Sequence, residues 1–308
     1  MAAPADGVLR TPDAAFEGLG RLGYAFAPHY VTLRCGLRVH YVDEGPRDAP
    51  ATVLCLHGEP SWSFLYRKMV PALAAAGHRV LAPDLVGFGK SDKPSAKAAY
   101  TYAAHVAWIT ELLLTLDLRR VTLVAQDWGG LIGLRLLAAH PGRFDAAVVA
   151  NTGLPTGEGH PSRAFLAWQA FAAAQTDMPV GSIVGGGCAS WPSDEVVAAY
   201  EAPFPDARYK AGAHVFPALV PTRADDPEAA ANRAAWDVLR GWRGRLHVMF
   251  SDSDPITRGA ERPFLALPCC ASSVVLAGGG HFLQEDVGPA FAEAIVRAMR
   301  GDGGRARL

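Results

Sequence analysis

The chain has no excess of charge of either sign. Lysine and arginine number 29 and aspartate and glutamate 30, which leaves a formal net charge of −1 over 308 residues. Only 19% of the residues are charged, against roughly 25% in an average globular domain. Nucleic acids are bound largely through their phosphates by clustered lysine and arginine, and the sequence contains no such cluster. We therefore expect no nucleic-acid partner.

Long apolar runs and paired cysteines are missing as well. The most apolar stretches are interrupted by Arg, Asp, His or Gly well before the roughly 18 residues that a membrane-spanning helix needs. The first sixteen residues carry two acids and two prolines rather than the apolar core of a signal peptide. The five cysteines are an odd number, and no C-x-x-C pair suggests zinc. We expect a cytoplasmic protein with no membrane association and no metal site.

Half of the residues are hydrophobic, and short β-rich runs alternate with longer helical patterns. Strands are expected at 29–33, 38–43, 52–56, 79–82, 121–125, 146–150, 246–250 and 273–276. Helices are expected at 63–76, 103–116, 131–139, 228–239, 260–267 and 289–300. This order predicts an α/β fold, in which helices flank a mostly parallel central sheet. A ligand site is then expected at the carboxyl ends of the strands.

The alternation of strands and helices stops after residue 152 and resumes near residue 227. The stretch between them contains proline and glycine clusters together with helical fragments near 162–174 and 194–200. It has the character of an inserted helical lid rather than of further sheet. We therefore predict one core domain made of residues 1–152 and 227–308, interrupted by a helical cap domain of residues 153–226.

The tightest local pattern surrounds Asp127. A β-rich run ends in Ala125-Gln-Asp127-Trp-Gly129, where small residues flank the central aspartate and a helix follows. This is the layout of a nucleophile elbow, a strained turn between a strand and a helix. A carboxylate there can displace a leaving group from saturated carbon and form an ester. The alternative is that Asp127 only caps the helix; residues 186–190 also have small flanks, but no core strand precedes them.

Two other loops carry groups that can assist such a nucleophile. His281 follows three glycines after the last predicted strand, and Asp252 and Asp254 follow the strand at 246–250. Either carboxylate could orient the histidine; the alternatives are a surface histidine and aspartates that only shape a turn. The order of nucleophile, acid and histidine is that of α/β-hydrolases. Since all three groups follow strands at one sheet edge, we predict a catalytic triad.

Several longer motifs extend over nearly the whole chain. They are VLRTPD at 8–13, YVDEG at 41–45, LHGEPSWS at 56–63, PDLVGFGKSD at 83–92, QDWGG at 126–130 and YEAPFPD at 200–206. In these motifs the chain resembles the haloalkane dehalogenases, a family of the α/β-hydrolase superfamily. The order of the triad resembles the subfamily whose acid comes late in the chain, after the seventh strand. The resemblance implies an α/β-hydrolase fold with an inserted helical cap.

By this resemblance Asp127 is the nucleophile, His281 the base and Asp254 the acid that orients His281. The implied reaction is the hydrolysis of a haloalkane to an alcohol, a halide ion and a proton. It proceeds through an alkyl ester of Asp127, which is hydrolysed by water that His281 activates. The implied partners are a small halogenated aliphatic substrate, halide and water, with no cofactor, and we expect a monomer.

The resemblance also implies a halide site and an oxyanion hole. Trp128 and Trp168 would bind the halide through their indole N–H groups, with Trp191 as the competing choice for the second indole. The backbone N–H groups of Glu59 and Trp128 would form the oxyanion hole. Four phenylalanines are expected either to line the cavity or to pack in the core: Phe165, Phe171, Phe204 and Phe216.

Other activities use the same scaffold. An epoxide hydrolase would share the Asp–His–Asp core and would need tyrosines to protonate the epoxide oxygen, for which Tyr200 and Tyr209 are available. A fluoroacetate dehalogenase would need arginines after the nucleophile, and Arg135 is the one candidate. A cofactor-free monooxygenase and a ligand receptor are the remaining alternatives. A complete triad argues against the receptor, because a pure binder needs no such set of groups.

Overall fold

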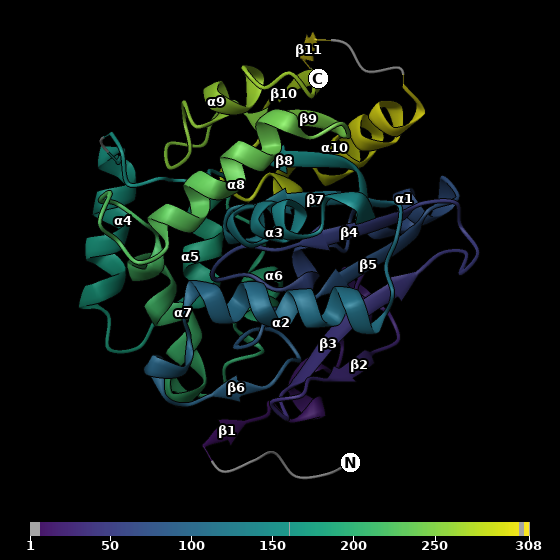
Figure 1. Ribbon diagram of the computed structural model, residues 1–308. Coiled ribbons are helices and arrows are strands. Elements are labelled where there is room, and N and C mark those ends of the chain that lie inside the picture. The colour runs from purple at the N-terminus through teal and green to yellow at the C-terminus, as the bar shows by residue number, and fades with distance from the viewer. Residues whose placement is uncertain (1–6, 160, 302–304, 308) are drawn as a thin grey trace.

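A computed structural model describes residues 7–159, 161–301 and 305–307, and within them nine strands form one sheet (Figure 1). The strand order is β11-β10-β9-β8-β7-β4-β5-β3-β2. The strands are β2 (His29–Thr32), β3 (Arg38–Glu44), β4 (Thr52–Leu56), β5 (Arg79–Pro83), β7 (Val121–Gln126), β8 (Phe144–Ala150), β9 (Arg245–Ser251), β10 (Cys270–Leu276) and β11 (Arg305–Arg307). Only the β2–β3 and β3–β5 pairs are antiparallel, which confirms the predicted mostly parallel sheet.

Helices cover both faces of this sheet (Figure 1). On one face α3 (Trp128–Ala139) packs between α2 (Tyr102–Thr115) and α8 (Ala229–Gly241). On the other face α1 (Val70–Ala75) packs against α10 (Leu283–Arg300). The short helix α9 (Glu261–Leu265) contacts β9 and β10, while β1 (Val8–Leu9) and β6 (Lys93–Pro94) form a separate antiparallel pair. None of the helices in the described ranges is long and apolar enough to cross a membrane.

The chain between β8 and α8 forms an inserted helical region. Its helices are α4 (Arg163–Ala174), α5 (Val180–Gly187), α6 (Asp194–Glu201), α7 (Ala211–Val215) and the 3-10 helices η6 (Ala207–Lys210) and η7 (Phe216–Leu219). The sequence predicted α4 and α6 but not α5, which contains four glycines. A Cβ on Gly181 would lie 2.2 Å from the carbonyl oxygen of Val197 in α6. Close packing of the two helices therefore outweighs the low helix propensity of glycine.

Two other predicted helices differ from the structure at proline. The helix expected at 63–76 is instead a 3-10 helix η3 (Ser63–Tyr66) followed by α1, because Pro71 fits the first turn of a helix but not its interior. The last helix begins at Leu283 rather than at residue 289. Pro289 lies inside α10, just after a kink at Val287, where φ is −128°. In both helices the sequence therefore misplaced the start of the helix relative to the proline.

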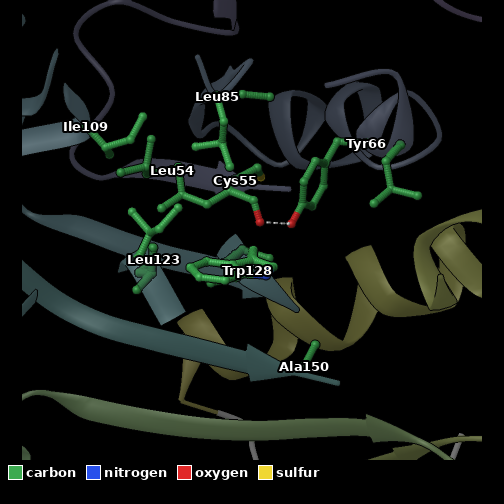
Figure 2. Close-up of a cluster of buried hydrophobic side chains, with 14 of the residues drawn as sticks. Leu54, Cys55, Tyr66, Leu85, Ile109, Leu123, Trp128 and Ala150 are labelled. Carbon is green, nitrogen blue, oxygen red and sulfur yellow. Dashed lines mark hydrogen bonds between the residues drawn. The ribbon is translucent and has the colours of Figure 1, made fainter. Parts of the chain in front are cut away.

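The centre of the sheet is dry and closely packed (Figure 2). All five residues of β4 and all six of β7 are buried, as expected for parallel strands with helices on both faces. Leu54 and Leu123 pack in the cluster that Figure 2 shows, and the hydroxyl of Tyr66 donates to the carbonyl oxygen of Leu56 at 2.8 Å. The loop that follows β7 therefore starts from a rigid base.

Candidate active site

Asp127 lies in a sharp turn between β7 and α3. Its φ of +51° and ψ of −127° are rarely adopted by residues other than glycine, at a cost of about 1–3 kcal/mol. Glycines surround it because there is no room: a Cβ on Gly58 would lie 2.4 Å from Asp127 Cβ, and one on Gly129 would lie 2.0 Å from the oxygen of Leu56. The carboxylate makes no capping hydrogen bond to α3, so the capping interpretation is wrong.

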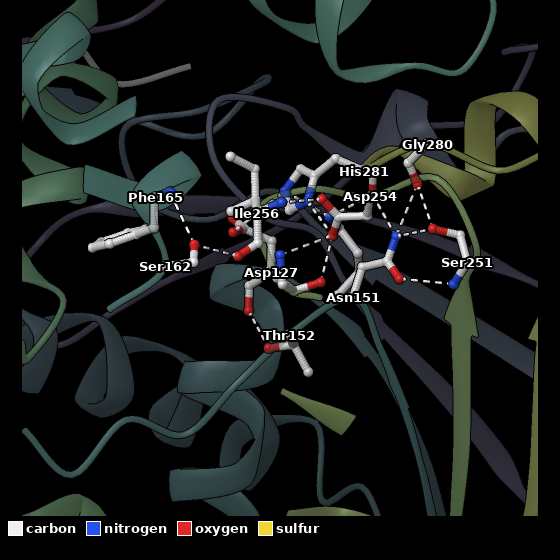
Figure 3. A network of polar contacts seen from close by, with 12 residues as sticks. Asp127, Asn151, Thr152, Ser162, Phe165, Ser251, Asp254, Ile256, Gly280 and His281 are labelled. Carbon is white, nitrogen blue, oxygen red and sulfur yellow. Dashed lines mark hydrogen bonds and ion pairs between the residues drawn. The ribbon is translucent and has the colours of Figure 1, made fainter. Parts of the chain in front are cut away.

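The structure brings the three predicted groups together at the carboxyl edge of the sheet (Figure 3). Asp127 Oδ2 lies 3.5 Å from His281 Nε2, and His281 Nδ1 lies 2.9 Å from Asp254 Oδ2. Asp252, the other candidate acid, accepts instead from the backbone N–H of Gly278 at 3.0 Å. An imidazole held between two carboxylates in this way can transfer a proton at Nε2 while Nδ1 fixes its orientation.

Asp254 is held as a carboxylate. The backbone N–H groups of Ile256 and Thr257 donate to it at 2.8 and 3.3 Å, and the Thr257 hydroxyl donates as well. Burial alone would raise its pKa, but the neighbouring His281 and these hydrogen bonds outweigh burial and lower the pKa to about 2. The group next to His281 Nδ1 is therefore negatively charged at neutral pH.

The pKa of His281 shifts in the opposite direction. Burial on its own would lower the pKa of its imidazole, yet Asp254 and Asp127 both favour the charged form and raise the pKa to about 10. In the resting site the two carboxylates therefore favour the protonated form of the imidazole. An imidazolium is not a base, so one of the neighbouring charges has to be removed before His281 can accept a proton.

Two amide side chains hold the main chain at His281. Asn151 Nδ2 donates to the carbonyl oxygens of Gly280 and His281 at 2.9 and 3.1 Å, and Gln126 Nε2 donates to that of His281 at 3.1 Å (Figure 3). The sequence places both residues at the carboxyl ends of strands, where some polar groups are expected to be functional, but assigns neither of them a role. The available signal was their position, because each follows or ends a parallel strand at the edge where Asp127 lies.

A cavity of about 1310 Å³ opens beside these groups. Asp127 and His281 line it from the core, and side chains of α4 and α5 line it from the inserted region. Phe165 and Phe171 line the cavity, whereas Phe204 and Phe216 are buried elsewhere in the hydrophobic core. The ring of Phe216 packs against that of Trp128, with ring centroids 4.6 Å apart. The four phenylalanines thus divide equally between cavity and core.

Two indoles line this cavity, Trp128 from the core and Trp168 from the inserted region. Trp128 is only 3% exposed, yet its Nε1–H has no hydrogen-bond acceptor within the described part of the chain. Trp168 lines the cavity from α4 and stacks against Phe171, with ring centroids 5.9 Å apart. Trp191 is 59% exposed and is not among the residues that line the cavity. The geometry therefore favours Trp168 over Trp191 as the partner of Trp128.

Glu59 contributes both its backbone and its side chain. Its backbone N–H donates to Asp127 Oδ1 at 2.8 Å, while no hydrogen bond to this oxygen is found for the N–H of Trp128 within the described residues. The Glu59 side chain lines the cavity, is 4% exposed, and its Oε1 has no partner there. Burial and the charge of Asp127 raise its pKa well above the usual range, partly offset by His281, so we infer a neutral acid.

The groups required by the rival activities lie elsewhere. The Tyr200 hydroxyl donates to Glu285 Oε2 at 2.7 Å in the core, and neither Tyr200 nor Tyr209 lines the cavity. Arg135 pairs with Glu228 at 2.9 Å between α3 and α8. Across the described ranges no group of three or more His, Cys, Asp or Glu side chains is arranged to hold a metal ion. The site thus offers an anionic nucleophile, an imidazole and two indoles around an apolar space.

Comparison with known proteins gives consistent results. Residues 51–286 match the alpha/beta hydrolase fold family. The chain is 49% identical over 297 residues to a haloalkane dehalogenase of Psychrobacter cryohalolentis, covering 94% of this chain and 97% of that protein. It is 50% identical over 295 residues to haloalkane dehalogenase 1 of Mycobacterium tuberculosis, covering 94% and 97%. Among solved structures, the tetrameric haloalkane dehalogenase DpaA of Paraglaciecola agarilytica has a TM-score of 0.88 and 36% identity, covering 93% of this chain and 96% of its own.

Proposed function

The chain belongs to the haloalkane dehalogenases of the alpha/beta hydrolase fold, and on that premise we propose that it hydrolyses haloalkanes to an alcohol, halide and a proton. The observation that carries the proposal is the carboxylate of Asp127 at the strained turn, within 3.5 Å of His281 and beside an apolar cavity lined by two indoles. A carboxylate in a desolvated space is a good nucleophile towards saturated carbon.

In the first step Asp127 attacks the carbon that bears the halogen. Glu59 N–H holds Oδ1, and we assign the attack to Oδ2, the oxygen that lies 3.5 Å from His281 Nε2. The new C–O bond forms as the carbon–halogen bond breaks, and the electron pair of that bond leaves with the halide. Trp128 and Trp168 donate their indole N–H groups to the departing anion, because each N–H is a donor with no competing lone pair.

In the second step water hydrolyses the ester. Alkylation makes Asp127 neutral, so one of the two charges that raise the pKa of His281 is lost and the imidazole can give up its proton. His281 Nε2 then takes a proton from water, and the hydroxide attacks the ester carbonyl. We assign the resulting oxyanion to the N–H groups of Glu59 and Trp128, and the orientation of His281 to Asp254. The carbonyl re-forms as its bond to the alkoxy oxygen breaks, the alcohol leaves with the proton that His281 took from water, and the carboxyl proton of restored Asp127 returns to the imidazole. The proton that the imidazole first gave up to solvent is the one that the overall reaction releases.

The remaining features of the proposal concern the whole chain. We propose that residues 153–226 act as a cap domain on a core of residues 1–152 and 227–308, and that the chain belongs to the subfamily with a late acid. We propose that the chain acts as a monomer, since Asp127, Asp254 and His281 meet without a contribution from a second copy, whereas the related DpaA is a tetramer. The five cysteines are free, which supports a cytoplasmic location. Light scattering after gel filtration tests the monomer against a mass of 32.6 kDa.

A panel of haloalkanes and epoxides tests the reaction itself. Incubation with 1-bromobutane or 1,2-dibromoethane should release bromide and alcohol in equal amounts, with no added metal or cofactor. Styrene oxide serves as the counter-substrate. Opening of styrene oxide without bromide release from any haloalkane would reject the proposal and favour an epoxide hydrolase.

A further inference from the structure

The loop that carries His281 has little to hold it in place by itself. It runs from the end of β10 to the start of α10 and contains three consecutive glycines, Gly278 with a φ of +79°. Glycines have no side chains that could pack and allow a wide range of backbone conformations. The position of the imidazole therefore depends on what binds the backbone of this loop from outside.

One partner of the loop is the glycine-rich segment 186–190. Small residues flank Cys188 in this segment, to which we assign no catalytic role. The two backbones lie in direct contact. A Cβ on Gly280 would lie 2.5 Å from the carbonyl oxygen of Gly187, and a Cβ on Gly187 would lie 2.6 Å from the ring of Phe282. The backbone N–H of His281 donates to that same oxygen at 2.7 Å. The small residues in both segments are thus explained by this close approach.

The second partner is Asp286, in the first turn of α10. Its carboxylate accepts from the backbone N–H of Gly280 at 2.8 Å. It also accepts from the backbone N–H of Ala189 at 2.8 Å and of Ser190 at 3.3 Å. One side chain therefore joins the His281 loop to a segment about 90 residues earlier in the chain. Hydrogen bonds from N–H groups to a carboxylate are stronger than neutral ones.

The carbonyl groups and the N–H groups of Gly280 and His281 are bound by different parts of the molecule. Asn151 and Gln126, from the sheet edge, bind the carbonyl groups of Gly280 and His281. The N–H groups of the same two residues are bound by Asp286 and by the inserted helical region. The inserted region is therefore part of the support of the imidazole as well as of the wall of the cavity.

We propose that Asp286 is a positioning residue that ties the segment 186–190 to the His281 loop and so sets the imidazole for the second step. The proposal rests on the proposed function, since it assigns a step to His281. Attack by Asp127 on the haloalkane needs no proton transfer, whereas hydrolysis of the ester requires His281 Nε2 at a defined position relative to water. Loss of the hydrogen bonds that Asp286 accepts should slow hydrolysis of the ester and leave alkylation of Asp127 nearly unchanged.

Rapid-quench kinetics of Asp286→Ala with 1-bromobutane separate the two steps. We expect a burst of about one bromide per active site at close to the wild-type rate, then a kcat reduced by about 10- to 100-fold, the cost of a misplaced catalytic group. The alkyl ester should accumulate on the peptide that contains Asp127, measured by its added mass. Asp286→Glu keeps the carboxylate and should restore most of the lost kcat.

Two further variants keep the test decisive. Asp286→Asn retains the size of the side chain but replaces one acceptor oxygen with a donor. We expect it to lose kcat as Asp286→Ala does, and it provides the test if Asp286→Ala folds poorly. Asp206→Ala is the matched control, since Asp206 accepts from the backbone N–H of Arg208 in the inserted region, away from His281. An unchanged kcat in Asp286→Ala and Asp286→Asn, or equal losses in burst rate and kcat, would overturn the proposal.

Amide hydrogen exchange tests the tie without any turnover. The N–H groups of Gly280 and His281 should exchange faster in Asp286→Ala and Asp286→Asn than in the wild type, and at the wild-type rate in Asp206→Ala. Wild-type protein that protects these amides but releases no bromide would reject the proposed function and leave the tie intact. Unchanged exchange in the Asp286 variants would overturn the tie whatever the activity.

Discussion

Helices α3 and α4 each bring one indole to the cavity, but they are held very differently. Nine of the twelve residues of α3 are buried, including Trp128. Of the twelve residues of α4, only Ala172 is buried, and Leu166 and Phe171 are 45% and 43% exposed. In the halide site that we propose, Trp128 is therefore held in a rigid helix and Trp168 in a loosely packed one.

This difference separates two requirements of the reaction. The carbon under attack has to meet Asp127 at a fixed angle, and a strained turn on a buried strand and helix provides that precision. The substrate also has to enter and the halide has to leave, which a helix with few buried residues permits. Changes at the sheet edge should therefore act on chemistry, while changes on α4 should act on binding and release.

The largest expected effect lies on the rigid side. Asp127→Ala removes the nucleophile and leaves water as the only attacking group. We expect bromide release to fall by about 10⁴-fold or more, as for other covalent nucleophiles. The thermal unfolding curve should change little, because within the described residues the carboxylate accepts one hydrogen bond, from Glu59 N–H, and pairs with His281. A variant that still turns over would assign the nucleophile elsewhere.

His281→Phe is expected to divide the reaction into its two steps. Alkylation of Asp127 should still occur, while hydrolysis loses its general base, at a cost of about 10²- to 10⁴-fold. Mass spectrometry of the Asp127 peptide should then detect the added alkyl group after incubation with 1-bromobutane. An unmodified peptide from a folded variant would contradict the two-step mechanism.

Trp168→Phe tests the loosely packed side. The variant keeps an aromatic ring on α4 but lacks the indole N–H, so halide binding should weaken and kcat/KM should fall by up to about 10²-fold. Titration with bromide, followed by quenching of tryptophan fluorescence, measures the binding. Trp191→Phe is the control, because Trp191 does not line the cavity. Loss of quenching in Trp191→Phe alone would show that the second indole has been misassigned.

The smallest effect is expected for Glu59→Gln, through the pH dependence of stability. In the folded chain the raised pKa keeps Glu59 protonated, whereas in the unfolded chain the group ionises at its ordinary value. Ionisation then favours the unfolded state increasingly as pH rises above that value, so glutamine should stabilise the protein more at pH 8 than at pH 5. We expect a gain in Tm of about 2–4 °C. Glu293→Gln, on the exposed side of α10, is the control.

The sequence predicted most of the framework because its signals are local. The strands at the sheet centre and the small residues around Asp127 follow from hydrophobic runs and from the spacing of the elbow. Asp254 was preferred to Asp252 by resemblance, and the structure brings the side chain of Asp254 to His281 Nδ1. The triad could be proposed because its members follow strands of one parallel sheet.

What the sequence could not predict depends on contacts between distant segments. The helix at α5 is unfavourable by glycine propensity and forms because its backbone packs on α6. Asp286 has no local pattern that distinguishes it from any acid in the first turn of a helix. Its partners lie in a segment whose position is set only when the inserted region has folded over the sheet. Neither feature has a signature in the linear order of residues.

The contact between Gly187 and Gly280 has a consequence for protein engineering. To exchange the inserted region between two relatives, one would normally choose junctions at the ends of the segment, near residues 152 and 227. The contact adds a third junction, within the exchanged segment, where the two backbones meet without side chains between them. A donor segment with a residue larger than glycine at position 187 would displace the His281 loop of the recipient, even if both ends of the segment were joined correctly. A successful chimera therefore has to match at three places rather than two.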